Sequence, residues 1–157
     1  MPARRLDPER LLAAVNAQRA ALGTEPWPGP VTIEALGAAG VTGVLAAIDA
    51  GREPQREALR TATVHTLGVL ERLAPGRAVE VRVPPFAAIQ CVEGPRHTRG
   101  TPPNVVETDA VTWVLLATGR MDWQAGVGSG TVRASGLRAD LSAYLPLVSA
   151  VPPPGIH

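Results

Sequence analysis

The stretch VEVRVPPFAAIQCVEGPRHTRGTPPNVVETD, residues 79–109, decides the fold, because the hydrophobic pattern changes its period there. Valine occupies every second position of residues 79–83 and alternates with Glu80 and Arg82. An alternation with a period of two predicts a strand that buries one face. The two prolines that follow must end this strand, since proline donates no backbone hydrogen bond to a sheet.

The sequence from this point onward predicts a mixture of strands and helices. Further strands are predicted at residues 86–92, 104–108 and 131–135, and helices at residues 109–118, 121–128 and 137–145. Asp109 is placed to cap the first of these helices, and Gly119 to end it. Residues 93–103 are rich in Gly and Pro, which predicts a loop.

The sequence before residue 79 has a helical pattern. Helices are predicted at residues 7–22, 31–50 and 54–74. The second is expected in two pieces, because Gly37, Gly40 and Gly43 interrupt it and glycine destabilises a helix. The domain organisation that we expect is an N-terminal helical extension, an α+β domain and a Pro-rich tail, over residues 1–53, 54–147 and 148–157.

The composition is that of a small folded domain. The chain has 157 residues, of which 45% are hydrophobic and 3% aromatic, so we expect one core built mainly of Ala, Val and Leu. A formal net charge of +1 gives no general attraction to nucleic acid. We recognise no secretory signal and no apolar run that could span a membrane, so a cytoplasmic location without stable membrane insertion is expected.

Cys91 and His97 are the first candidates for chemistry. A cysteine nucleophile needs a nearby base and a lowered pKa. The alternation instead places Cys91 with Ala87 and Ile89 on an apolar strand face, which favours a small buried core residue. With one Cys and no pair of His at a metal-like spacing, we predict no disulfide, no metal site and no catalytic residue.

The loop after Cys91 offers a different chemistry, that of an anion site. Arg96, His97 and Arg99 lie together in it, and Arg120 could join them from the end of the next helix. Guanidinium groups suit phosphate or carboxylate, and the glycines of the loop free backbone N–H groups for the same purpose. The alternative is structural, because nearby carboxylates could pair with these arginines and fix the loop to the sheet: Glu93, Glu107 and Asp109.

Two stretches of the C-terminal half carry a resemblance to a known family: VEVRVPPFAAIQCVEGPRHTRGTPPNVVETDAVTWVLLATGR, residues 79–120, and VRASGLRADLSAYLPL, residues 132–147. They resemble the sterol carrier protein family, in its actinobacterial branch. The resemblance covers residues 54–147. It implies an α+β fold with a mixed five-stranded sheet, helices on one face, and an apolar tunnel between them for lipid or sterol chains.

The function that this resemblance implies is non-catalytic binding of a hydrophobic or amphipathic small ligand, with no cofactor. The head group of the ligand would meet Arg96, His97, Arg99 or Arg120. Its apolar tail would pass the aromatic residues Phe86, Trp113 and Trp123, for which ordinary core packing is the alternative role.

A second function follows from the same resemblance. The fold also occurs as an accessory domain, for example in mycothiol-dependent isomerases. The chain could therefore be an accessory or interaction module for a separate, thiol-cofactor-dependent enzyme, or could form a homodimer. The sequence departs from those isomerases, since its N-terminal helices carry no cluster of His and carboxylates that would bind their metal.

Overall fold

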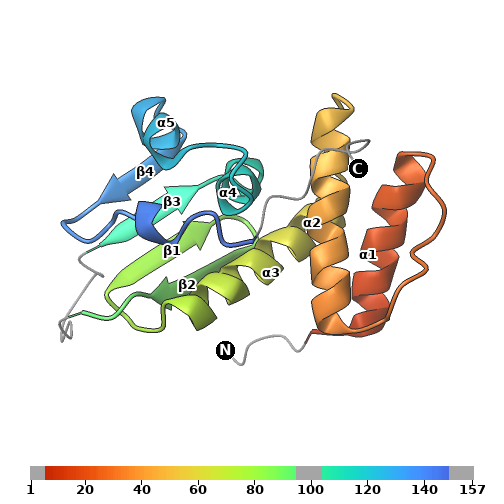
Figure 1. Cartoon of the computed structure of the whole chain (residues 1–157), viewed down its shortest axis with the longest axis horizontal. Coiled ribbons are helices and arrows are strands. Elements are labelled where there is room, and N and C mark those ends of the chain that lie inside the picture. The colour runs from red at the N-terminus through yellow and green to blue at the C-terminus, as the bar shows by residue number, and fades with distance from the viewer. Residues whose placement is uncertain (1–5, 95–103, 149–157) are drawn as a thin grey trace. The chain divides into compact units, whose positions relative to one another are not determined.

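The computed structural model of the chain describes residues 6–94 and 104–148. The chain divides into two compact units, Met1–His65 and Thr66–His157, with the division inside a helix. The elements in chain order (Figure 1) are α1 (Pro8–Ala21), α2 (Ile33–Asp49), α3 (Arg56–Leu73), β1 (Val79–Val83), β2 (Ala87–Cys91), β3 (Val105–Thr108), α4 (Ala110–Ala117), α5 (Trp123–Gly128), β4 (Val132–Ser135) and the short 3₁₀ helix η1 (Ser142–Tyr144).

The N-terminal unit contains α1, α2 and the first part of α3. The side chain of Asp7 caps α1 and that of Thr32 caps α2, each by accepting a backbone N–H of the first turn. Val15 of α1 packs with Leu36 of α2 in a small apolar cluster. The buried side chain of Gln18 accepts a hydrogen bond from the backbone N–H of Gln55 at 2.7 Å, which joins α1 to the chain before α3.

The expected break in the second helix is wrong, because α2 is one continuous helix. Its three glycines lie where neighbouring side chains take up the space that a Cβ would need: His65 at Gly37, Thr61 at Gly40 and Gln18 at Gly43. A Cβ on Gly37 would lie 2.2 Å from a ring nitrogen of His65. These glycines therefore allow close helix packing, which offsets their low helix propensity.

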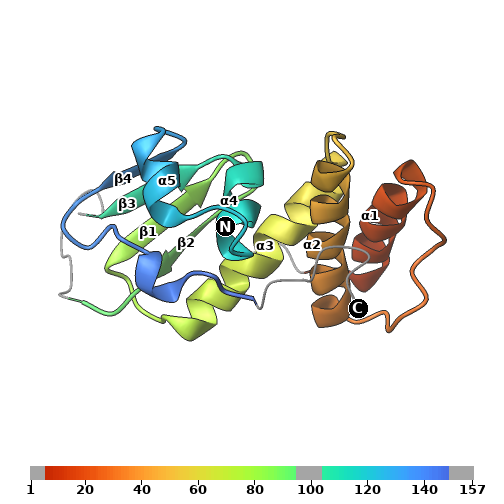
Figure 2. The same cartoon turned by 45° about the horizontal axis from the view of Figure 1, so that its top comes forward.

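The C-terminal unit is built on a mixed sheet in the order β2-β1-β3-β4 (Figure 2). β1 pairs antiparallel with β2 and parallel with β3, and β3 pairs antiparallel with β4. The α+β class is confirmed, but the described residues form four strands where we expected five. Val81 lies opposite Ile89 on one side and Val106 on the other, so these apolar residues share one face of the sheet.

The two faces of the sheet differ in chemistry. The three valines of β1, Val106 of β3 and Cys91 lie fully buried on one face. The other face carries charged side chains in two ion pairs, Arg82 with Glu80 and Arg133 with Glu107. The helices therefore cover the apolar face, and the alternation seen in residues 79–83 correctly separates the two faces.

Residues 74–78 lead from α3 into β1. They lie between Val92 and Asn104, which stand at the two ends of the connection from β2 to β3. On one side, the backbone N–H of Ala78 donates to the carbonyl oxygen of Val92 at 3.0 Å. On the other side, the buried side chain of Asn104 donates from Nδ2 to the carbonyl oxygen of Ala78 at 2.8 Å. The Oδ1 atom of Asn104 accepts the backbone N–H of Arg138 at 2.9 Å, so one side chain joins three segments.

The expected helix at residues 137–145 is also wrong, since only η1 forms there. The carboxylate of Asp140 accepts the backbone N–H of Ser142 at 2.8 Å, a local bond that competes with helix formation. Hydrogen bonds from Ser142 also lower the pKa of the Asp140 carboxyl. The segment after β4, residues 136–148, is thus an irregular strap that contains only η1, and it buries Ala139 and Leu141.

A substitution at Gly76 tests how closely the backbone of residues 74–78 packs against the backbone of Val92. Its φ is +151°, and a Cβ would lie 2.1 Å from the carbonyl oxygen of Val92, which is backbone and cannot rotate away. We expect Gly76→Ala to lower the free energy of unfolding by about 3 kcal/mol or more, measured by urea denaturation. Gly128→Ala is the matched control, because a Cβ there meets nothing within 4 Å. Equal stabilities of the two variants would contradict the packing described for residues 74–78.

Candidate functional site

The candidate site is the apolar layer between the sheet and the helices of the C-terminal unit. The side chain of Asp109 starts α4 by accepting the backbone N–H of Thr112 at 2.9 Å and its hydroxyl at 2.7 Å. As predicted, Asp109 is a helix cap. The cap fixes the start of a strongly apolar helix, which brings Trp113 and Leu116 to the layer.

Trp113 is the largest fully buried side chain of this layer. Its indole Nε1–H donates to the hydroxyl oxygen of Thr66 on α3 at 2.8 Å. A buried indole N–H needs such a partner, because leaving it without one costs about 1–3 kcal/mol. The hydrogen bond therefore joins α4 to α3 and fixes the orientation of the indole ring.

Trp123, the first residue of α5, is 5% exposed. Asp122 caps this helix, since its carboxylate accepts the backbone N–H of Ala125. α5 lies close to β4, since a Cβ on Gly126 would be 2.9 Å from a methyl group of Val132. Both tryptophans predicted to line a ligand site are thus buried inside the C-terminal unit.

The layer is closed around its most buried side chains. A side chain with no accessible surface borders no space that a water molecule could occupy, and residues of the sheet, of α3, of α4 and of the strap meet this condition: Val79, Val81, Val83, Cys91, Val106, Leu70, Trp113, Val114 and Leu141. A ligand that enters between these residues must therefore displace part of the protein.

The structure describes two of the remaining predicted site residues, and neither of them is buried in this layer. Phe86 is half-buried just before β2, and its backbone N–H donates to the carbonyl oxygen of Val83. Arg120 is exposed after α4. The predicted anion-site residues Arg96, His97 and Arg99 lie outside the described residues.

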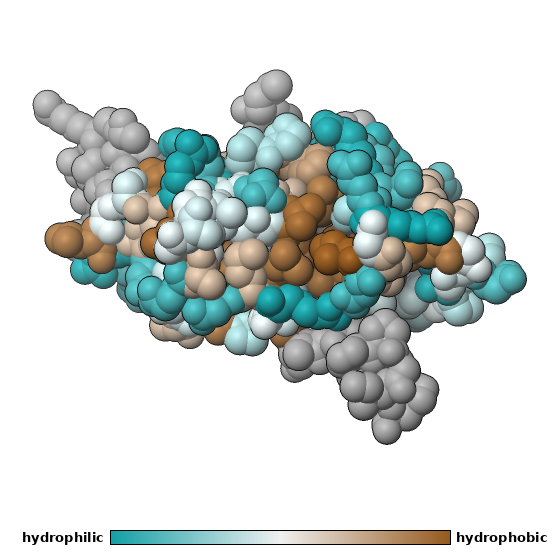
Figure 3. Space-filling view, turned by 90° about the horizontal axis from the view of Figure 1, so that it is seen from above, coloured by the Kyte–Doolittle hydropathy of each residue, from teal (hydrophilic) through white to brown (hydrophobic). Residues whose placement is uncertain are grey.

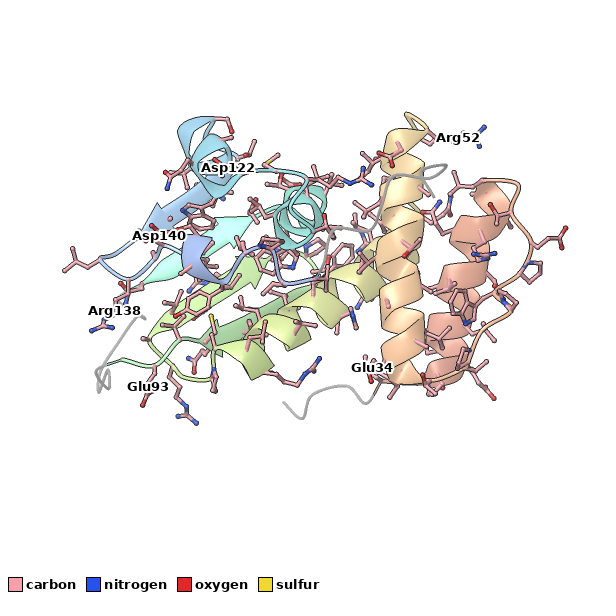
Figure 4. All side chains as sticks on the ribbon, viewed as in Figure 1. Glu34, Arg52, Glu93, Asp122, Arg138 and Asp140 are labelled. Carbon is pink, nitrogen blue, oxygen red and sulfur yellow. The ribbon has the colours of Figure 1, made fainter. Side chains whose placement is uncertain are left out.

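The two residues that border this undescribed segment, Gly94 and Asn104, are both held beside Ala78. A Cβ on Gly94 would lie 2.8 Å from the Cβ of Ala78 and 3.3 Å from the guanidinium of Arg138. Figure 4 shows exposed Glu93 and Arg138 on this part of the unit. The role of Asn104 was not predicted from the sequence, in which Asn104 is only a polar residue at the start of an apolar strand.

Cys91 is buried, as the alternation of its strand predicts. Burial, with a smaller contribution from the charge of Glu71, raises the pKa of its thiol from 9.0 to about 11. The thiolate is the nucleophilic form, so this cysteine is unreactive at neutral pH. Within residues 6–94 and 104–148, no group of three His, Cys, Asp or Glu could hold a metal ion.

An open pocket of about 330 Å³ lies elsewhere, where β1 and β3 end and β4 begins. Its lining includes Glu107, Asp109 and Arg133, and none of the predicted site residues that the structure describes. Its polar side chains already have partners in the protein, since Glu107 pairs with Arg133 and Asp109 caps α4. We therefore do not assign the ligand site to this pocket.

These features define a class of protein, an α+β unit whose mixed sheet buries one face beneath helices. The chain belongs to a family of bacterial sterol carrier-like proteins: the family model described as "Bacterial SCP ortholog" matches residues 55–147, more than half of its length. No curated protein matches the sequence. Within the part of the chain that the structure describes, no helix is long and apolar enough to cross a membrane.

The raised pKa of Cys91 predicts a pH-dependent stability. The folded state favours the protonated thiol, so this contribution is complete below pH 9 and is lost as the pH rises towards about 11. The loss is at most about 2.7 kcal/mol, from ~1.36 kcal/mol for each pKa unit. Urea denaturation across this range should show a steeper fall for the native sequence than for Cys91→Ala, and equal slopes would refute the assignment.

Proposed function

We propose that the chain binds a hydrophobic or amphipathic small ligand and does not catalyse a reaction on it. The observation that carries this proposal is the family match, which covers every helix and strand of the unit that contains the apolar layer. The buried, unreactive thiol of Cys91 is consistent with a binding role.

In this proposal the ligand tail lies in the apolar layer and its polar head group lies at the surface. Trp113, Trp123 and Phe86 contact the tail, and arginine side chains contact the head group: Arg120, and Arg96 and Arg99 with His97 between them. Arginine suits an anionic head group, because its guanidinium can make two parallel hydrogen bonds to a carboxylate or phosphate.

Simple energetics allow such binding even though the layer is closed. Burial of an alkyl chain stabilises a complex by about 0.8 kcal/mol for each CH₂, or roughly 9 kcal/mol for dodecanoate. Loss of translational freedom and displacement of packed side chains oppose this gain, and the former alone costs an estimated ~4 kcal/mol or more. We therefore expect weak to moderate affinity, with dissociation constants in the micromolar range or above.

The closed layer supports a second candidate function, an accessory or interaction module for a separate enzyme. Such a module needs a filled core and an exposed contact surface. Leu137 is fully exposed, and Val127 and Leu73 are partly exposed on the same unit. Figure 3 shows one face of the molecule, where hydrophobic residues gather among hydrophilic ones.

Native mass spectrometry of the purified protein, followed by organic extraction, separates the two functions. The binding proposal predicts a co-purified apolar compound, or a rise in the melting temperature when dodecanoate is added to protein free of ligand. A bare mass together with an unchanged melting temperature in the presence of dodecanoate would exclude the binding proposal and favour the interaction module.

A further inference from the structure

The strand β4 forms one edge of the sheet, and among the described residues β3 is the only strand that pairs with it (Figure 1, Figure 2). The outer side of an edge strand carries backbone N–H and C=O groups that can pair with a further strand. Arg133, Ala134 and Ser135 are all exposed, so the middle and the end of β4 are accessible to such a strand.

One hydrogen bond shows which backbone groups of β4 point outward. The backbone N–H of Glu80 donates to the carbonyl oxygen of Asn104 at 3.0 Å, so the backbone groups of Asn104 point towards β1. Because these groups alternate along a strand, those of Glu107 point the other way, towards its partner Arg133 on β4. The backbone groups of Ala134, the next residue, therefore point away from the sheet.

We propose that this edge is the interface between two copies of the chain, which pair antiparallel through β4 about a two-fold axis at Ala134. In this arrangement Ala134 lies opposite Ala134 of the second copy, and the two residues exchange both of their backbone hydrogen bonds. The two four-stranded sheets become one continuous sheet. The interface lies outside the apolar layer, so this inference is independent of the proposed ligand.

The charges of β4 suit a second copy as its partner. Arg133 is the one charged residue of the strand, and its guanidinium pairs with Glu107 of its own chain. An axis at Ala134 places Arg133 opposite Ser135 of the second copy. An axis at Arg133 would instead place two guanidinium groups opposite each other, which is destabilising. The small side chain of Ala134 offers no obstacle at the axis itself.

The same pairing covers exposed apolar side chains beside β4. Leu137, two residues after the strand, is fully exposed, and antiparallel pairing brings it close to the start of β4 in the second copy. Val127 is 38% exposed on α5, which packs against Val132 at the start of the strand through Gly126. Exposed apolar residues that flank an open strand edge are typical of an association surface. The strand is short, so we expect a weak dimer.

Disulfide trapping tests the position of the axis. Antiparallel residues that exchange both hydrogen bonds have Cα atoms about 5.5 Å apart, a separation that a disulfide spans. We expect Ala134→Cys to form a covalent dimer under mild oxidation, without interference from Cys91, which is buried. The matched control is Ala88→Cys, at an exposed alanine of the opposite edge strand β2, which should stay monomeric. A covalent dimer of both variants, or of neither, would overturn the inference.

Sedimentation equilibrium gives a second test, which starts from the native sequence. We expect a dimer that forms as the protein concentration rises from the micromolar to the millimolar range. Ala134→Lys should dimerise at least about tenfold more weakly, because it places two ammonium groups opposite each other. Ala88→Lys adds the same charge at the other edge and should dimerise as the native sequence does. A native sequence that stays monomeric, or a dimer that Ala134→Lys leaves unchanged, would overturn the inference.

Discussion

The fold of the C-terminal unit depends on one constraint, the passage of residues 74–78 between the two ends of the connection from β2 to β3. Val92 holds one side of this passage and the side chain of Asn104 holds the other. Val92 has a φ of +66°, which is strained for a β-branched residue, so the surrounding bonds must outweigh that strain. Because Asn104 also binds the backbone of Arg138, the same passage fixes the start of the strap.

This constraint joins the fold to the proposed function. The passage sets the position of β1, and β1 supplies the buried valines that form the floor of the apolar layer. The hydrogen bond between Trp113 and Thr66 fixes the opposite side, formed by α3 and α4. Buried hydrogen bonds therefore hold both sides of the apolar layer.

The sequence could predict the elements whose hydrophobic periodicity is strong. The predictions failed where one contact with another part of the chain, or one local hydrogen bond, determines the local structure. The alternation over residues 79–83 located β1 and its buried face, and Asp109 marked the start of α4. The glycines of α2 resembled helix breakers, because only the structure shows His65 and Thr61 lying against them. The hydrogen bond from Ser142 to Asp140 replaced the expected last helix, and the role of Asn104 depends on residues far from it in the chain.

The most direct measurement is quenching of tryptophan fluorescence by a fatty acid that carries bromine on its alkyl chain, in the variant Trp27→Phe. That substitution removes the tryptophan of the N-terminal unit and leaves Trp113 and Trp123 of the C-terminal unit. Binding of the tail in the apolar layer predicts saturable quenching, because bromine must come close to a buried indole. Quenching no greater than that caused by dissolved bromide would contradict the account.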